Sequence, residues 1–171
     1  LKNNENINWV PEHFKHGRFK NTIETAPDWC LSRTRYWATA MPVWECNECK
    51  EREVFGSIEA IEKRSNQKVT DLHRPKIDQV KFDCKKCDGQ MERVEEVLDC
   101  WMESGSMPYA EYHYPFENEQ KFEESFPADF ISEYTGQLRA WFYYLHVLST
   151  ALFDTECFKN CVVSGVMRGD D

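Results

Sequence analysis

The chain has 171 residues, a formal net charge of -9, and 41% hydrophobic and 14% aromatic residues. This composition excludes a disordered chain, and the length predicts one globular core with room for a small second module. The negative charge argues against a free-standing nucleic-acid-binding domain, because phosphate binding needs a cationic surface, but it leaves open a piece of a larger RNA-binding enzyme.

The two ends of the chain predict neither a targeting signal nor a complete protein. Leu1–Glu5 has no basic start followed by an apolar stretch, so it resembles neither a secretory nor a transit signal, and we expect a cytoplasmic protein. The first residue is not methionine, and the strand-like Val162–Val166 lies close to the last residue, so both ends are expected to be cuts through a longer chain. No apolar run approaches the ~20 residues that span a bilayer, so no membrane partner is expected.

The first 45 residues predict short elements. Ile7–Val10 is apolar and predicts a short extended piece. His13 and His16 lack cysteine neighbours, so surface histidines are favoured over metal ligands. Asp28 predicts the cap of a short helical turn, and Ala40–Trp44 predicts a short strand.

Arg33 and Arg35 are the densest positive charge in this part of the chain. Guanidinium groups bind phosphates and carboxylates through charge-assisted hydrogen bonds. The pair is therefore compatible with two interpretations, a contact with an anionic substrate or RNA backbone, and a structural ion pair.

Four of the eight cysteines form two C-x-x-C pairs, Cys46 with Cys49 and Cys84 with Cys87. Nothing in the sequence indicates secretion, so two such pairs favour a metal over disulfides. Each pair presents two thiolates on one side of a tight turn, and zinc suits four sulfur ligands because it is tetrahedral and redox-inactive. Four thiolates leave no position for water, so the predicted zinc is structural and helps to fold a small module.

The segment between the two pairs, residues 50–83, is longer than the usual zinc-site spacer of about 15–20 residues. Ile58–Arg64 predicts a helix and Ile77–Phe82 an extended segment, and together they describe a zinc ribbon with an insertion. Two alternatives stay open: four free or mutually oxidised cysteines, and a site in which His73 replaces one cysteine. Four cysteine ligands are the favoured set.

Beyond Met91 the pattern returns to mixed strand and helix. Val94–Leu98 predicts a short strand that runs into Asp99–Tyr109, where a serine–glycine turn is expected. Trp101 in this segment is compatible with the wall of an apolar pocket or with ordinary core packing. Tyr112–Ser125 predicts a loop that leads to a short helix.

The stretch from Ala128 to Phe153 predicts a strand, a polar turn and a helix. Ala128–Ser132 predicts a buried strand, and Glu133–Gly136 lacks apolar periodicity, with Gly136 supplying the freedom that a tight turn needs. Apolar residues then recur at helical spacing from Leu138 to Leu152. Phe158–Val166 predicts the next strand, which implies a right-handed parallel crossover.

Ligands of open α/β sheets bind at the carboxyl ends of strands, which places Glu133, Gln137 and one edge of Trp141 where a small substrate would lie. The alternative is an ordinary connection whose polar turn is solvated. The last two cysteines, Cys157 and Cys161, are expected to be ordinary thiols.

Several segments together resemble the class I aminoacyl-tRNA synthetases, and most closely their isoleucyl members. The resemblance covers nearly the whole chain, and the valyl and leucyl members look different after the last strand. The segments that carry it are N-W-V-P-E-H-F-K-H-G-R-F (Asn8–Phe19), D-W-C-L-S-R-T-R-Y-W-A-T-A-M-P-V-W (Asp28–Trp44), L-H-R-P (Leu72–Pro75), V-L-D-C-W-M-E-S-G-S-M-P-Y (Val97–Tyr109) and Phe126–Phe153.

The resemblance implies an α/β fold: the second half of a class I synthetase nucleotide-binding (Rossmann-like) catalytic domain, with a small zinc ribbon inserted. Residues 1–27 would be the tail of the editing insertion and the re-entry segment, and residues 28–45 a connection within the catalytic domain. Residues 46–92 would be the zinc ribbon, and residues 93–171 the second half of the nucleotide-binding fold.

By the same resemblance, Trp101 and Trp141 would enclose an isoleucine side chain between flat, rigid walls. Glu133 would hold the adenylate by accepting hydrogen bonds from ammonium or ribose hydroxyl groups. Gln137 would reach the adenylate as well, and Gly136 would let the backbone approach. No acid or base is conspicuous, so the chemistry would depend on positioning and on stabilising charge at the phosphate.

The implied reaction joins isoleucine to ATP, with Mg²⁺, to give isoleucyl-adenylate and pyrophosphate, and then transfers the aminoacyl group to tRNA(Ile). The H-I-G-H and K-M-S-K-S motifs that bind the ATP phosphates do not occur in the chain, so it is expected to need the missing halves of the synthetase and to be inactive alone. An apolar slot discriminates poorly against valine, which lacks one methylene, and editing is the family's remedy.

The chain departs from the family pattern at a few positions. Gly136 stands where many members carry aspartate, Ala140 and Ala38 where glycine is common, and Met102 and Glu103 replace a frequent phenylalanine–aspartate. These departures concern details of substrate contact and not the family. Two other functions stay open, a valyl-type synthetase fragment and a free-standing zinc-ribbon binding module.

Overall fold

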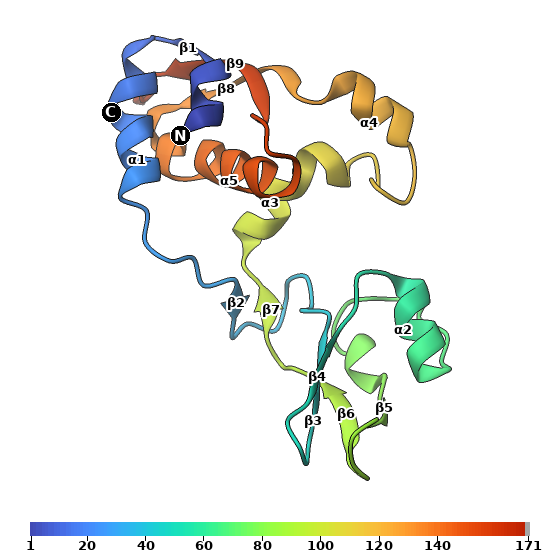
Figure 1. Cartoon of the computed structure of the whole chain (residues 1–171). Helices are drawn as coiled ribbons and strands as arrows, with labels where there is room; N and C mark the ends of the chain where they lie inside the picture. The colour runs from blue at the N-terminus through green and yellow to red at the C-terminus, as the bar shows by residue number, and fades with distance from the viewer. Residues whose placement is uncertain (170–171) are drawn as a thin grey trace. The chain divides into compact units, whose positions relative to one another are not determined.

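The computed structural model describes residues 1–169 and separates into two compact units, each with its own apolar core. Unit 1 comprises Leu1–Trp29 together with the residues from Trp101 onward, and unit 2 comprises Cys30–Cys100. The chain therefore leaves unit 1 after Trp29 and returns to it at Trp101 (Figure 1).

Unit 1 is built from a parallel sheet and the helices around it. Its elements are η1 (Lys2–Asn6), β1 (Asn8–Val10), η2 (Lys15–Phe19), α1 (Lys20–Glu24), α3 (Cys100–Ala110), α4 (Glu119–Ser125), β8 (Ala128–Tyr134), η4 (Thr135–Arg139), α5 (Trp141–Phe153) and β9 (Phe158–Ser164).

The sheet of unit 1 has the strand order β1-β9-β8, and both pairings are parallel. The central strand β9 alternates buried and less buried positions, with Phe158, Cys161 and Val163 inside. These side chains share one core with Phe142 and Leu145 of α5, which runs along one face of the sheet (Figure 1). The predicted parallel strand–helix–strand arrangement is confirmed.

Three details of this strand–helix–strand unit differ from the prediction. The strand β8 was expected to be buried, but its residues are exposed or half-buried. The strand β8 continues through Glu133 and Tyr134, because they pair with Val163 and Ser164 of β9. Gly136 lies in η4 without a positive φ, so a left-handed turn is not why glycine stands there. A Cβ at Gly136 would lie 2.6 Å from Cε2 of Tyr134, so a larger residue would require the exposed Tyr134 ring to move. The predicted helix is confirmed and begins at Trp141.

The predicted serine–glycine turn after Trp101 is wrong, because residues 100–110 form α3. Gly105 is buried in this helix, and a Cβ there would lie 2.8 Å from Leu148 Cδ1 and 3.2 Å from the Tyr144 carbonyl oxygen. Glycine therefore allows α3 to pack closely against α5. This contact is between distant parts of the sequence, so the local composition does not predict it. The predicted helix after the Tyr112 loop is confirmed as α4.

His146 in α5 is a buried imidazole whose titration should affect stability. Burial lowers the pKa of His146 to about 4, and its Nδ1 has no hydrogen-bond partner among residues 1–169. An unfolded histidine titrates near pH 6.5, so between about pH 6.5 and 4 only the unfolded state binds the proton. The free energy of unfolding is therefore expected to fall by up to about 3 kcal/mol across this window on acidification.

Urea unfolding at several pH values checks this expectation. Other groups of unit 1 also titrate below neutral pH, so the informative quantity is the difference between the native chain and His146→Gln, which keeps a similar volume without a titrating ring. The variant should lose less stability on acidification. Parallel pH profiles for the two proteins would show that His146 is not protonated on unfolding.

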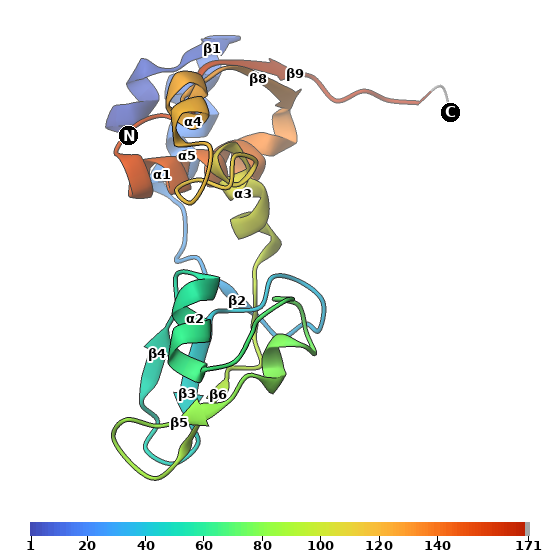
Figure 2. The same cartoon turned by 90° about the vertical axis from the view of Figure 1, so that its right-hand side faces the viewer.

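Unit 2 consists mainly of antiparallel strands. Its elements are β2 (Ser32–Arg33), β3 (Val43–Cys46), β4 (Arg52–Val54), α2 (Ile58–Ser65), η3 (Ile77–Gln79), β5 (Phe82–Asp83), β6 (Gln90–Arg93) and β7 (Val97–Leu98). Four strands form an antiparallel sheet in the order β4-β3-β6-β5, and β2 pairs with β7. Trp44, Phe82 and Met91 of the sheet share a core with Ile61 of α2. Figure 2 shows α2 and the strands of this unit.

The predicted elements of unit 2 are confirmed in part. The helix over Ile58–Arg64 is confirmed as α2, and the strand expected at Ala40–Trp44 begins instead at Val43. The extended segment at Ile77–Phe82 is wrong in its first half, since Ile77–Gln79 forms the 3₁₀ turn η3. The helical turn expected at Asp28 is wrong as well, because residues 26–31 have no regular structure and β2 follows.

Ser57 is expected to set the start of α2. Its Oγ accepts a hydrogen bond from the backbone N–H of Ala60 at 3.2 Å, which is the geometry of an N-cap. Replacing Ser57 by alanine should destabilise unit 2 by about 1 kcal/mol, whereas Ser57→Asp should retain the cap and most of the stability. Thermal unfolding of the three proteins, each loaded with metal, measures the difference. Equal losses in both variants would contradict the capping role.

No helix within residues 1–169 combines the length and the apolar character that crossing a membrane requires.

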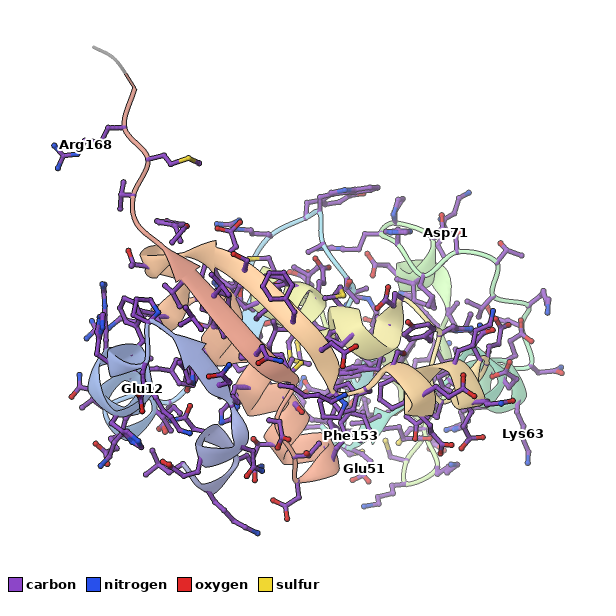
Figure 3. All side chains as sticks on the ribbon, turned by 90° about the horizontal axis from the view of Figure 1, so that it is seen from above. Glu12, Glu51, Lys63, Asp71, Phe153 and Arg168 are labelled. Carbon is purple, nitrogen blue, oxygen red and sulfur yellow. The ribbon has the colours of Figure 1, made fainter. Side chains whose placement is uncertain are left out.

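Arg168 lies on the extended segment that follows β9 (Figure 3).

Candidate functional site

The four cysteines of the two C-x-x-C pairs come together in unit 2. Cys46 ends β3 and Cys49 lies in the turn before β4, while Cys84 and Cys87 lie in the turn between β5 and β6. Their Sγ atoms all lie within 4.8 Å of one another, with Cys46 and Cys87 at 3.4 Å and Cys49 and Cys84 at 3.7 Å. Tetrahedral zinc with bonds of about 2.3 Å places sulfur atoms about 3.8 Å apart, so this group fits a zinc ion.

Backbone groups and a glycine complete this four-cysteine cluster. The N–H groups of Lys86 and Gly89 donate to the sulfurs of Cys84 and Cys87 at 3.3 and 3.4 Å. A Cβ at Gly89 would lie 2.8 Å from the Cys46 sulfur, so a larger residue would crowd the site. These contacts stabilise thiolate ligands and keep the space for an ion.

The thiols of the cluster differ in acidity: the pKa of Cys46 is lowered, whereas hydrogen bonds with neighbouring thiols raise the pKa of Cys49 and raise that of Cys87 to about 12. Burial disfavours the Cys46 thiolate, but hydrogen bonds from the backbone of Cys49 and Glu48 outweigh it and lower the pKa of Cys46 to about 7. A thiol with this pKa is partly deprotonated at neutral pH, which is the form that binds metal. His73 does not join the cluster: its ring stacks on Trp37 and its Nδ1 lies 2.8 Å from Asp71. The preference for four cysteines over a histidine ligand is therefore supported.

Among the remaining candidates of the amino-terminal part, the structural ion pair is supported for Arg33. Arg33 forms an ion pair with the buried Asp99, with 2.7 Å between Nη2 and Oδ2. Arg35 is exposed, and so are His13 and His16.

The five predicted substrate-binding residues all belong to unit 1, and four of them follow one another along the carboxyl end of β8 and into α5. Glu133 is exposed, and its Oε2 accepts the backbone N–H of Tyr134 at 2.9 Å. The side-chain carbonyl of Gln137 accepts the backbone N–H of Trp141 at 3.0 Å. These hydrogen bonds to the backbone hold the side chains of Glu133 and Gln137 in fixed orientations.

Trp141 and Trp101 are half-buried on neighbouring helices. The indole N–H of Trp141 donates to the carbonyl oxygen of Ser104 at 3.1 Å, which ties the start of α5 to α3 about one turn after Trp101. The Trp101 ring stacks on Tyr144 with 5.0 Å between centroids and 15° between planes. The structure thus gathers both indoles around the contact between α3 and α5.

Two aromatic residues at this position escaped the sequence analysis. Tyr144 lies three residues after Trp141 on the same helix, and Trp29 packs against it with 4.6 Å between ring centroids. Tyr144 therefore contacts two indoles, Trp29 and Trp101. The helical spacing from Trp141 was the available signal for Tyr144, whereas nothing local indicated Trp29.

The other two cysteines of unit 1 are buried thiols. Burial raises the pKa of Cys157 and of Cys161 to about 12, so both stay protonated and unreactive at neutral pH. The expectation of ordinary thiols is consistent with this.

Comparisons with known proteins agree along the whole chain. The family described as tRNA synthetases class I (I, L, M and V) matches residues 1–171. Isoleucine–tRNA ligase 2 of Pseudomonas fluorescens is 53% identical over 171 residues, which is 100% of this chain and 17% of that protein. The isoleucine–tRNA ligase of Treponema denticola is 52% identical over 100% of this chain and 16% of its own length.

A more distant relative and a solved structure extend the comparison. An isoleucine–tRNA ligase of Dictyostelium discoideum, whose name includes the word cytoplasmic, is 50% identical over 100% of this chain and 16% of its own length. The LeuRS of Agrobacterium radiobacter, solved in a ternary complex with tRNA and LeuAMS, matches with a TM-score of 0.57 and 18% identity, over 82% of this chain and 19% of that chain. That identity supports the fold alone. The chain spans about a sixth of the length of the curated relatives it matches.

Proposed function

Because this chain belongs to the class I tRNA synthetases, we propose that it is part of an enzyme that activates isoleucine with ATP and Mg²⁺ and transfers it to tRNA(Ile). The observation that carries this proposal is the arrangement of Glu133, Gln137 and Trp141 in sequence at the carboxyl end of β8, the position where ligands of α/β sheets bind. By the same reasoning unit 1 is part of the nucleotide-binding catalytic domain. From the name of the Dictyostelium discoideum relative we further propose that the enzyme acts in the cytoplasm.

The aromatic residues of α3 and α5 would form the amino-acid pocket. Trp141 has its backbone N–H and its indole N–H bonded to Gln137 and Ser104, so its ring is fixed before a substrate binds. Trp101 is held by its stack on Tyr144. Two immobilised flat walls suit a branched aliphatic side chain, because little conformational entropy is lost when it enters.

The polar residues would orient the adenylate. The hydrogen bond from Tyr134 N–H uses one oxygen of Glu133 and leaves the other to accept from an ammonium or ribose hydroxyl group. The amide group of Gln137 can still donate from its nitrogen, since its bond to Trp141 uses the carbonyl oxygen. In the first step the isoleucine carboxylate attacks the α-phosphorus of ATP and pyrophosphate leaves, and these residues would hold the reactants in line without transferring a proton.

The cysteine cluster would have a structural role in this enzyme. Zinc held by Cys46, Cys49, Cys84 and Cys87 has all four positions filled by sulfur, and it supplies cross-links that stabilise unit 2. It takes no part in adenylate formation.

The exposed side of β8 suggests where the missing halves of the synthetase pack. Phe130 and Tyr134 lie four residues apart on this edge strand, so both point to the same face, and they are 59% and 43% exposed. Parallel sheets are normally covered on both faces, so an exposed aromatic row on one is a candidate surface for further protein. We propose that the rest of the catalytic domain covers it.

The test of the proposed function is a chimera. The 171 residues replace the matching segment of the Pseudomonas fluorescens ligase, and isoleucine-dependent exchange of pyrophosphate into ATP is measured. A chimera that activates isoleucine in preference to valine supports the proposal. A chimera that folds, binds zinc and binds tRNA but fails to activate isoleucine, or that prefers valine, would overturn it.

A further inference from the structure

Two exposed cysteines, Cys30 and Cys100, flank the short ladder of β2 and β7 in unit 2. The ladder pairs Ser32 with Leu98 and Arg33 with Val97, and continuing this register beyond the end of the ladder matches Cys30 with Cys100. The backbone contact continues in that direction, because Asp99 N–H donates to the carbonyl oxygen of Leu31 at 2.8 Å. Cys30 and Cys100 are therefore the residues that follow the Leu31–Asp99 pair in this direction.

The Arg33 side chain fixes the backbone on both sides of this pair. Its Nη1 donates to the carbonyl oxygens of Cys30 and Ser32 at 2.6 and 2.8 Å, and its Nη2 donates to the Asp99 carboxylate at 2.7 Å. Asp99 is only 3% exposed and directly precedes Cys100. One guanidinium group therefore clamps the residues that carry the two thiols.

The pairing geometry is compatible with a disulfide. A regular ladder would put the Cα atoms of Cys30 and Cys100, which flank the Leu31–Asp99 hydrogen bond, about 4.5 Å apart. Here the ladder itself ends at Ser32 and Leu98, and Cys100 is the first residue of α3. Disulfides accept Cα separations of about 4.4–6.8 Å. The Cys30 sulfur now lies 3.6 Å from Ser32 Oγ and the Cys100 sulfur 3.5 Å from Asp99 Oδ1, so both side chains must rotate about χ1 to bond.

The other six cysteines are otherwise engaged: four form the metal cluster and two are buried with a raised pKa. Hydrogen bonds from the Ser32 hydroxyl, followed by the Ser32 backbone and the Arg33 charge, lower the pKa of the Cys30 thiol. Cys30 is thus the stronger candidate for the attacking thiolate.

We propose that Cys30 and Cys100 form a reversible disulfide that fastens together the two chain segments joining unit 1 to unit 2. With a low-molecular-weight disulfide as oxidant, the Cys30 thiolate attacks one of its sulfurs and releases one small thiolate. The Cys100 thiolate then attacks the Cys30 sulfur and releases the second. Two protein thiols are oxidised, one small disulfide is reduced, and the two protons lost by the protein thiols are taken up by the two small thiolates to give two small thiols.

The bond would act on the aromatic group of unit 1. The residues next to the two cysteines are Trp29 and Trp101, and both pack on Tyr144. Joining Cys30 to Cys100 restrains the backbone directly before Trp101, a proposed wall of the isoleucine pocket. This consequence rests on the proposed function, whereas formation of the disulfide does not, so the two can fail separately.

Peptide mapping tests the disulfide. The chain, loaded with zinc, is incubated with oxidised glutathione, alkylated and digested with trypsin, which yields Asn21–Arg33 and Val94–Lys121 with one cysteine each. We expect these two peptides to be recovered mainly as a linked pair that separates on reduction. In Cys100→Ser the Cys30 peptide should carry glutathione instead. Recovery of the two peptides as alkylated thiols, as glutathione adducts or joined to other cysteines would overturn the proposal.

A relocated thiol is the matched control. The double variant Cys30→Ser, Leu31→Cys keeps an exposed thiol at the neighbouring position, since Leu31 is 40% exposed, but places it opposite Asp99 and not opposite Cys100. We expect its yield of peptide linked to Cys100 to fall about tenfold or more, because the Cβ atoms then point apart. Equal yields from the native and relocated thiols would show that register does not direct the reaction and would overturn the proposal.

Discussion

Removing the metal from the four-cysteine cluster is expected to unfold unit 2. Unit 2 spans residues 30–100, and a domain of this size rarely gains more than about 3–5 kcal/mol from one apolar core. Zinc bound by four thiolates contributes on the order of 10 kcal/mol at neutral pH, so its loss exceeds what the core can offset. The core around Trp44 and Met91 should therefore lose its protection when a chelator is added.

Hydrogen exchange followed by mass spectrometry measures this loss segment by segment. Peptides from β3, β6 and α2 should exchange rapidly after chelation and recover when zinc is restored. Metal analysis of the reduced chain should give one zinc per chain, and a value far below one would contradict the site.

Two cysteine variants provide a matched comparison. Cys49→Ser removes an exposed ligand, whereas Cys30→Ser removes an exposed thiol outside the cluster. Only Cys49→Ser should lower zinc content and speed exchange in unit 2. Equal behaviour of the two variants would mean that the cluster does not hold the fold.

The parts that the sequence predicted correctly depend on neighbours in the chain. The two C-x-x-C turns each bring two sulfurs together locally, and the rest of the site follows from pairing β3 and β5 with β6. The helix α2 begins at a residue whose side chain caps it, and α5 shows its apolar spacing directly. These signals need no knowledge of distant contacts.

The wrong predictions involve contacts between distant segments. The Ser-Gly-Ser-Met-Pro run of α3 has poor helix propensity, but Gly105 allows α5 to approach closely enough for Trp141 to bond the Ser104 carbonyl. Glu133 was placed in a turn because its own segment is polar, whereas pairing with Val163 keeps it in the strand. Trp29 meets Tyr144 across more than a hundred residues, which no local pattern reports.

The residues predicted to bind substrate show the same contrast between local signals and distant contacts. Glu133, Gly136, Gln137 and Trp141 lie within one strand–helix connection, so a single segment predicted their proximity. The position of Trp101 relative to Trp141 depends on how α3 packs on α5. The hydrogen bond from Trp141 to Ser104 and the stack of Trp101 on Tyr144 show that the two indoles are close. That these five residues bind isoleucyl-adenylate stays a prediction.

Replacing Trp141 by alanine is expected to lower kcat/KM for isoleucine activation in the chimera by about 100-fold or more. The indole would be a wall of the amino-acid pocket, and losing a buried aromatic anchor typically costs at least about 2–3 kcal/mol of binding. Trp141→Phe keeps a flat apolar ring but cannot donate to the Ser104 carbonyl, so it should lose about tenfold, the size of one hydrogen bond.

Loss of packing alone must be separated from loss of the pocket. Tyr143 follows Trp141 by two residues on α5 and is also a partly buried aromatic packed on the unit 1 core, so Tyr143→Ala is a matched control. Both alanine variants should lower thermal stability, but only Trp141→Ala should reduce isoleucine activation at temperatures where both are folded. If the two variants lost activation equally, Trp141 would be a packing residue, and the proposed isoleucine pocket between α3 and α5 would be wrong.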